Sequence, residues 1–194
     1  MGDFATAAQL ASFLQQDLDT TSADLAITMA EGLVRAYCRQ NITEATSTGA
    51  VLPIQVTDFG YIVRLSERPV SAVSAVSVNG TAYVSGTDYA WDGVSDWLRL
   101  ATVEWSSDSF EAFPPAVVTY TYGYATVPAA VQAVTLSVAG RLYDNPRGMR
   151  SESVEGYTYQ RGGAGDDILS AGLSEAEKAS LAKFVRRAST VMVG

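Results

Sequence analysis

Acidic side chains are the residues of this sequence whose types and spacing come closest to a catalytic pattern. Two carboxylates that face each other in a cleft, about 5 Å or roughly 6.5–9.5 Å apart, can hydrolyse a glycosidic bond. The central part of the chain holds six candidates for such a pair: Asp88, Asp92, Asp96, Glu104, Asp108 and Glu111. Most of them fall in predicted turns between strands, where Asp is common because its side chain accepts hydrogen bonds from the nearby backbone. We therefore expect solvated turns here and no catalytic pair.

Histidine is absent from the sequence and cysteine occurs once, at Cys38. Without His, the chain cannot build Ser-His-Asp or Cys-His catalysis or a metal site based on imidazole. A single Cys excludes an intramolecular disulfide and argues against a thiolate zinc site. Neither a phosphate-binding loop nor a dinucleotide fingerprint occurs. We expect no cofactor, no metal and no enzymatic activity, and a Cys38 side chain that is buried in a helix.

Two further patterns suggest ligand binding. Residues 162–170, GGAGDDILS, match one copy of the calcium β-roll repeat, but a roll needs stacked copies, so we interpret this stretch as a mobile loop. Aromatic residues on the predicted strands could instead form a carbohydrate platform, although alternating aromatics more often pack a sheet or a subunit interface. These residues are Tyr83, Tyr89, Trp91, Trp97, Trp105, Tyr120, Tyr122 and Tyr124. A carbohydrate-binding or adhesin-like β module therefore stays as an alternative.

Length and composition indicate a globular protein of one domain, or of one domain with an insertion. The chain has 194 residues, of which 47% are hydrophobic and 18% charged. No apolar run approaches the roughly 18 residues that span a bilayer, and the first residues do not resemble a signal peptide, so we expect a cytoplasmic site of synthesis. The net charge of −8 argues against a protein that grips DNA and is compatible with one that DNA slides past.

The N-terminal region predicts two helices, over residues 4–18 and 22–40. A turn joins them, so residues 1–45 are expected to form an antiparallel helix hairpin, with Thr21 or Ser22 as the cap of the second helix. The spacing of Leu25, Met29, Leu33 and Ala36 places them on one face of that helix, and we expect this face to be buried.

From residue 51 to residue 124 the apolar residues alternate, as they do in strands. The segments are short, rich in Val, Tyr and Trp, and separated by turn residues. Asn79 and Gly80 favour a type I′ hairpin turn, in which both central residues need positive φ. Pro114 and Pro115 precede the last strand, which ends in the alternating aromatic sequence YTYGY. This region predicts an inserted antiparallel β-sheet or sandwich.

The C-terminal part of the chain returns to helical spacing. A core helix is expected over residues 126–145, capped by Thr126, with Val131, Val134, Val138 and Leu142 on its buried face. Residues 146–172 are interpreted as a long flexible loop with a short strand at GYTYQ, and residues 173–194 as the C-terminal helix, which opens on a capping box at Ser174. The predicted fold class is α+β: a small helical bundle, made of the N-terminal helix hairpin and two C-terminal helices, with an inserted antiparallel β-sheet or sandwich.

The order of these segments resembles the head-to-tail adaptor, or head–tail connector, proteins of long-tailed bacteriophages. Four stretches carry the resemblance: LSERPVSAVSAVSVNGTAYVSGTDYAWD at 65–92, YTYGYATVPAAVQAVTLSVAGRLYDNP at 120–146, SESVEGYTYQ at 151–160 and LSEAEKASLAKF at 173–184. The similarity spans nearly the whole chain, residues 1–194, as a single connector domain. Its motifs are structural and include no catalytic signature, and many connectors lack so large a β insertion.

The resemblance implies a structural virion protein at the neck, at the portal vertex, that is present in the host cytoplasm during assembly. Its partners would be its own copies in a ring of about twelve, the portal protein, and the next neck or tail-completion protein. DNA would pass through the channel without specific binding, and no membrane would be involved. Interface propensities single out Met149, Tyr157, Tyr159 and Arg161 in the long loop as candidate contacts with these partners. Another neck or tail-completion protein of the same virion is the nearest alternative.

Overall fold

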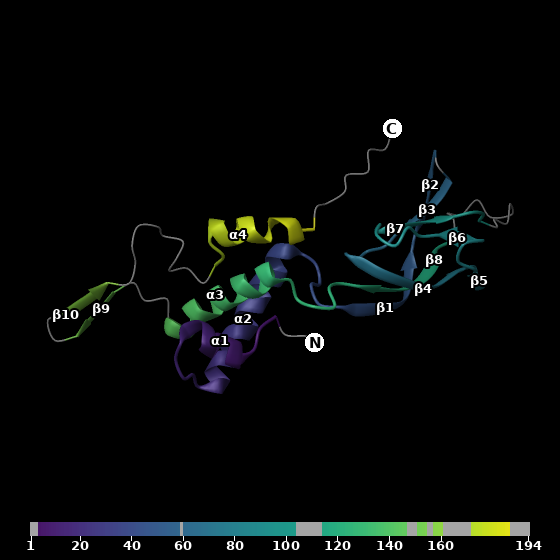
Figure 1. Cartoon of the computed structure of the whole chain (residues 1–194). Helices are drawn as coiled ribbons and strands as arrows, with labels where there is room; N and C mark the ends of the chain where they lie inside the picture. The colour runs from purple at the N-terminus through teal and green to yellow at the C-terminus, as the bar shows by residue number, and fades with distance from the viewer. Residues whose placement is uncertain are drawn as a thin grey trace. The chain divides into compact units, whose positions relative to one another are not determined.

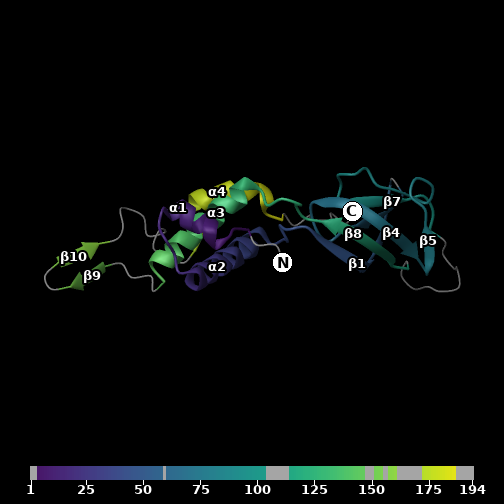
Figure 2. The same cartoon turned by 60° about the horizontal axis from the view of Figure 1, so that its bottom comes forward.

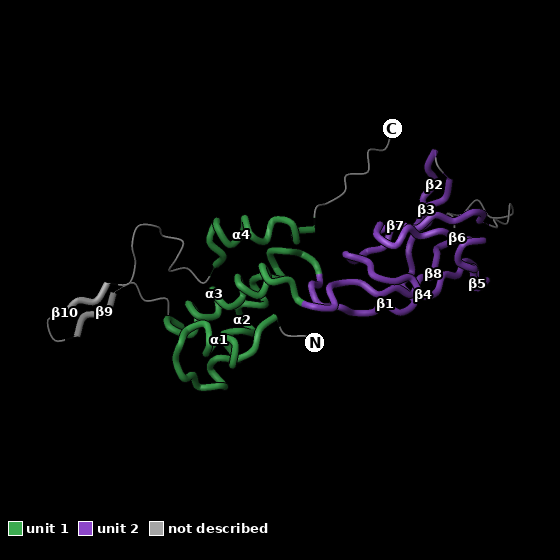
Figure 3. The backbone as a smooth tube through the Cα atoms, viewed as in Figure 1, with its two compact units in different colours: residues 1–40, 127–194 green, residues 41–126 purple. Residues whose placement is uncertain are grey.

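The computed structural model describes residues 4–58, 60–103, 114–146, 151–154, 157–160 and 172–186. The described chain is α+β, as predicted: helices lie at both ends of the sequence and antiparallel strands lie between them (Figure 1). It divides into two compact units, one formed by residues 1–40 and 127–194 and the other by residues 41–126 (Figure 3). The first is called the helical unit below and the second the β unit.

The helical unit is built around helix α3 (Ala129–Asp144). Helices α1 (Ala7–Leu14), α2 (Thr20–Cys38) and α4 (Glu175–Leu181) each pack against α3, and the short 3-10 helix η1 (Ala182–Phe184) follows α4 directly. The backbone N–H of Asp19 donates to the hydroxyl of Tyr143 at 3.1 Å, so α2 begins where α3 ends. The predicted buried face of α3 is confirmed, because Val131, Val134 and Val138 are at most 5% exposed.

The helix starts agree with the sequence at α4 only. Ser174 and Glu177 form the predicted capping box, with each side chain accepting from the other residue's backbone N–H. The predictions of Thr21 or Ser22 and of Thr126 as caps are wrong. Asp19 caps α2 through a hydrogen bond from the Ser22 N–H, and Pro128 occupies the cap position of α3 without a side-chain bond. Asp19 precedes the helix by one residue and reaches the donor at N3, which is where a cap must sit.

The predicted buried face of α2 is also wrong. Leu25 and Met29 are 63% and 50% exposed, and Ala36 is exposed as well. The face that packs against the rest of the unit instead carries small residues: Ala23, Ala26, Ile27, Ala30, Val34 and Cys38. Alanines at three or four residue intervals let two helix backbones approach closely, so the small face packs on α3 and the large side chains stay outside.

A polar network fastens α4 to α3. The guanidinium of Arg141 donates to both carboxylate oxygens of Glu177, at 2.7 and 2.9 Å. The hydroxyl of Ser137 and the backbone N–H of Ser174 donate to the same carboxylate, at 2.9 and 2.8 Å. Burial raises the pKa of Glu177, but these four donors outweigh it, and the net pKa is below the ordinary value.

Two four-stranded antiparallel sheets make up the β unit (Figure 1). The first has the order β1-β8-β4-β5 and the second the order β2-β3-β7-β6. Their strands are β1 (Ala45–Leu52), β2 (Ile54–Thr57), β3 (Gly60–Arg64), β4 (Val70–Val78), β5 (Thr81–Tyr83), β6 (Tyr89–Ala90), β7 (Trp97–Leu100) and β8 (Ala116–Tyr122). The unit begins earlier in the chain than the predicted insertion at residue 51, since β1 already pairs with β8 from Ala45.

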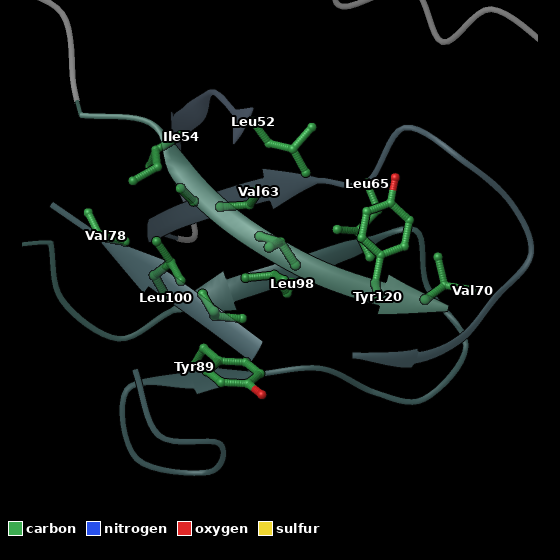
Figure 4. Packing of buried hydrophobic residues seen from close by; sticks show 13 residues of the cluster. Leu52, Ile54, Val63, Leu65, Val70, Val78, Tyr89, Leu98, Leu100 and Tyr120 are labelled. Atoms are coloured by element: carbon green, nitrogen blue, oxygen red, sulfur yellow. The ribbon is translucent and has the colours of Figure 1, made fainter. Parts of the chain in front are cut away.

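The core of the β unit is shared by both sheets. Figure 4 shows Tyr120 of β8 and Val70 of β4 among side chains from the second sheet, which include Val63 and Leu98. Tyr120, Val63 and Leu98 are at most 1% exposed. Inward-facing residues from two sheets that bury one common set of side chains are the packing of a β-sandwich, which was one of the two predicted forms of the insertion.

The Asn79–Gly80 turn and Gly123 have backbone conformations that residues other than Gly rarely adopt. Asn79 and Gly80 have φ of 51° and 78° between β4 and β5, as the predicted type I′ turn requires. Gly123 follows β8 with φ of +91°, and a Cβ added there would lie 2.3 Å from the Thr43 carbonyl oxygen. Gly123 is therefore required by a close approach between two backbone segments as well as by its torsion angle.

Part of the predicted loop at residues 146–172 forms strands. β9 (Ser151–Val154) pairs antiparallel with β10 (Tyr157–Gln160), in the register Tyr157 opposite Val154 and Gln160 opposite Ser151. The short strand predicted at GYTYQ is therefore confirmed for residues 157–160, whereas β9 was not predicted. Asn145 ends α3, in agreement with the helix stop expected before Pro146.

Candidate functional site

The four residues predicted as partner contacts lie in different parts of the 146–172 region. Tyr157 and Tyr159 belong to strand β10. Met149 and Arg161 lie outside the described residues, as does the β-roll match at 162–170. The structure therefore places two of the four on one strand and leaves their role as contacts a prediction.

An apolar surface that the sequence did not predict lies on the helical unit. Leu25 and Met29 project from the outer side of α2 one turn apart, so both side chains lie on one face. They border an open groove of about 380 Å³ between α2 and the end of α3, lined also by Ala26, Leu142, Tyr143 and Pro146. Large apolar side chains beside a groove are unusual on a surface that faces only water. We call this surface the helix groove.

The helix groove owes its exposure to the packing of α2. Because the alanine face of α2 is the one buried against α3, Leu25 and Met29 have no place in the core. The sequence contained a signal for this exposure. Helix α2 carries two apolar faces, one of small side chains and one of large side chains, and a helix on the surface of a unit buries only one face.

The first sheet of the β unit carries a second exposed surface, which has no charged residue in its strands and holds two exposed valines. Val51 of β1 and Val117 of β8 lie opposite each other in the strand register and are 66% and 36% exposed. All four strands of this sheet lack Asp, Glu, Lys and Arg. The exposed neighbours are small, namely Thr46, Ser71, Ala72, Ser74 and Ala75. We call this surface the uncharged sheet.

The carboxylates considered for catalysis have structural partners instead. Asp92 accepts hydrogen bonds from Val94 and Ser95 in its own turn, and those from Ser95 lower the pKa of Asp92 to about 2. Asp88 accepts from the Val84 N–H at 2.8 Å, and Asp96 forms an ion pair with Arg68. These are the turn roles expected from the sequence. Glu104, Asp108 and Glu111 lie outside the described residues.

The aromatic residues considered for carbohydrate binding are divided between core and surface. Tyr89 and Tyr120 are buried in the core of the β unit, where they cannot contact a glycan. Trp91 is half-buried and donates its indole N–H to the Ser95 carbonyl at 2.8 Å. Trp97 is 38% exposed, and Trp105 lies outside the described residues. The described aromatics thus serve mainly to pack the sheets.

The described residues offer neither a metal site nor a membrane-spanning helix. They contain no group of three or more acidic or cysteine side chains placed to hold a metal ion. Within the same residues, no helix has the length and hydropathy needed to cross a bilayer. Cys38 is fully buried, as predicted, and burial raises the pKa of its thiol to about 11.

Comparisons with known proteins returned no match: no family model matches the chain, and no curated protein is significantly similar to it.

Proposed function

We propose that this chain is a head-to-tail adaptor: a structural virion protein that forms a ring between the portal and the tail or neck of a long-tailed phage. In this proposal the ring extends the DNA channel, and the four helices act as the small helical bundle that the sequence suggested. The order of segments supports the proposal, because the β unit interrupts the helical unit between α2 and α3, as an inserted element would.

One observation carries the proposal: each unit exposes apolar side chains on a surface of its own. The helix groove, with Leu25 and Met29, belongs to the helical unit, and the uncharged sheet, with Val51 and Val117, belongs to the β unit. A closed ring uses heterologous contacts, in which each copy offers one surface and receives a different one. Complete burial of a side chain such as Leu or Met contributes about 1.5–3 kcal/mol, so covering Leu25 and Met29 would supply part of the free energy of such a contact.

The charge of the chain fits a channel protein that does not hold DNA. The net charge of −8 would repel phosphate and keep DNA moving through the ring. Met149, Tyr157, Tyr159 and Arg161 remain our candidates for contact with the portal or with a neighbouring copy. The nearest alternative is another neck or tail-completion protein of the same virion, and direct binding to the portal protein distinguishes an adaptor from it.

Electron microscopy of the purified chain, alone and mixed with a cognate portal protein, tests this proposal. We expect rings of one diameter, containing about twelve copies. Replacing Leu25 and Met29 together by Glu should abolish the rings and leave the circular dichroism spectrum unchanged, because both side chains are already exposed. Val94→Glu is the matched control, since Val94 is 81% exposed but belongs to neither surface.

Two outcomes would contradict the proposal. The first is a chain that stays monomeric with portal present. The second is ring formation by the Leu25→Glu, Met29→Glu variant as efficient as that of Val94→Glu. Deleting residues 148–170 should leave a folded subunit that no longer completes heads, and normal head completion by that variant would remove the assigned role of the loop contacts.

A further inference from the structure

Strand β1 is the longest edge strand of the β unit. It has eight residues and pairs with β8 on one side, whereas the opposite edge of the same sheet, β5, has three. The edges of the second sheet, β2 and β6, have four and two residues. Figure 2 shows β1 along the border of its sheet. Its outer backbone groups are therefore available to another strand, within the part of the chain that the structure describes.

Edge strands are usually protected against pairing, and β1 has little of that protection. Charged side chains, above all Lys, and Pro are the common devices, and β1 reads ATSTGAVL without either. A bulge between Ser47 and Ala50, with Gly49 at φ +64°, is its one protective feature. The bulge divides β1 into two straight arms, residues 45–47 and 50–52. Each arm can accept a short strand and would reject a long one.

Hydrogen bonds next to the first arm show which of its backbone groups face outward. The N–H of Gly123, which follows β8, donates to the Pro69 carbonyl at 2.8 Å on the β4 side, so the Tyr122 carbonyl points the opposite way, toward β1. Successive residues of a strand direct their N–H and C=O groups to opposite sides. Ala45 and Ser47, which lie opposite Tyr122 and Tyr120, therefore direct theirs toward β8, and Thr46 directs its own toward the open edge.

Within the described part of the chain, the β9–β10 pair lacks a further strand to pair with, whereas β1 has an open edge. Among the described strands, β9 and β10 pair only with each other, and each strand has four residues. Two isolated strands are marginally stable in water, and a third strand is usually needed. β10 reads YTYQ, uncharged and rich in residues that favour strands, whereas β9 contains Glu152. β10 is thus the strand that suits an uncharged edge, and its length suits one arm of β1.

We propose that β10 of one copy adds to the edge of β1 in a second copy. The product is one six-stranded sheet shared by two copies, in the order β9-β10-β1-β8-β4-β5. Main-chain hydrogen bonds supply the affinity in such strand addition, and the alternating side chains supply the specificity. The inference rests on the proposed ring, for which it names one of the contacts between neighbours. In this arrangement Tyr157 and Tyr159, as residues of β10, belong to the strand that pairs with the neighbouring copy.

Mixing two single-cysteine variants tests this contact between copies. One variant carries Thr158→Cys in β10, and the other carries Ala45→Cys, Thr46→Cys or Ser47→Cys in β1. Because Cys38 is buried, it does not compete. A disulfide between the two variants can form only between different chains, and only where their Cα atoms come within about 7 Å. Ala82→Cys in β5, exposed on the opposite edge of the same sheet, is the matched control.

We expect mild oxidation to give at least about tenfold more mixed dimer with one of the β1 positions than with Ala82→Cys. No excess at any of the three positions would overturn the inference. A chain that carries both cysteines and closes the disulfide only within itself would overturn it too, because β10 would then belong to the β1 edge of its own copy.

A proline variant supplies a second readout. Thr46→Pro removes an outward N–H and leaves the pairing with β8 intact, which is the position where an edge strand tolerates Pro. We expect it to remove the cross-link between Ala45→Cys and Thr158→Cys, whereas Thr46→Ala retains it. Rings without the cross-link would refute strand addition and leave the adaptor proposal standing. A cross-link in a chain that forms no rings would support strand addition and refute the adaptor proposal.

Discussion

Gly123→Ala is the substitution whose cost the structure defines best. The residue has φ of +91°, where a side chain other than Gly costs about 1–2 kcal/mol. Its new Cβ would lie 2.3 Å from the Thr43 carbonyl oxygen and 2.7 Å from the carbonyl carbon, so the two backbone segments must separate. That movement disturbs the hydrogen bonds from the Tyr124 N–H to Ile42 (2.8 Å) and from the Glu44 N–H to Tyr124 (3.1 Å).

We expect Gly123→Ala to lower the free energy of unfolding of the β unit by about 3 kcal/mol. The positive φ and two weakened hydrogen bonds, at about 1 kcal/mol each, give about 3–4 kcal/mol, and the stiffer unfolded chain returns about 0.4–1 kcal/mol. Gly49→Ala is the matched control. Its φ is +64°, but the nearest atom to an added Cβ is 3.9 Å away, so it should cost only about 1 kcal/mol.

Urea denaturation followed by tryptophan fluorescence measures both variants. All three Trp residues, at 91, 97 and 105, lie in the β unit, so the signal reports that unit. The reasoning predicts that Gly123→Ala loses about 2 kcal/mol more than Gly49→Ala, at an unchanged denaturant slope. Equal losses would show that the close approach to Thr43 does not constrain the junction after β8, and would refute the argument.

Three further predictions concern the helical unit. Glu177→Gln should destabilise it by about 1–3 kcal/mol, because Arg141 loses its charged partner. The lowered pKa of Glu177 contributes stability that is complete above about pH 4.5 and is lost as the pH falls through the folded value. Circular dichroism melts should therefore show a weaker loss below pH 4.5 in the variant than in the parent chain. Cys38, with a pKa of about 11 against an ordinary 9.0, should react with a thiol reagent at pH 8 at least about 100-fold more slowly in the folded than in the unfolded protein. Gly32→Ala should stabilise α2 by about 0.5–1 kcal/mol, since no atom lies within 4 Å of the added Cβ, and a lower melting temperature would contradict this.

Secondary structure could be predicted from the sequence where local chemistry decides it. The Ser174–Glu177 capping box, the Asn79–Gly80 turn and the valine face of α3 were all predicted because each depends on residues within one turn or one helix. Strand β1 was missed before residue 51 because ATSTGAVL has no large alternating apolar residues. Its strand character comes from pairing with β8, some seventy residues later in the chain.

The candidate site depended on information that the sequence does not contain. The period of α2 allows two buried faces, and only packing against α3 decides that Ala23, Ala26 and Ala30 are inside and that Leu25 and Met29 are outside. The open edge of β1 is likewise a property of strand order, which sequence patterns leave undetermined. In both cases the sequence shows the residues themselves, but only the packing of helices and the order of strands determine that they are exposed.

The copy number of this chain in assembled particles is the most direct test of the claim that it acts through contacts between identical copies. Quantitative mass analysis of purified necks, compared with the portal protein as an internal standard, would measure it. We predict the same number in every preparation, about twelve copies per particle. A single copy per particle, or a chain that is absent from the neck, would contradict the account.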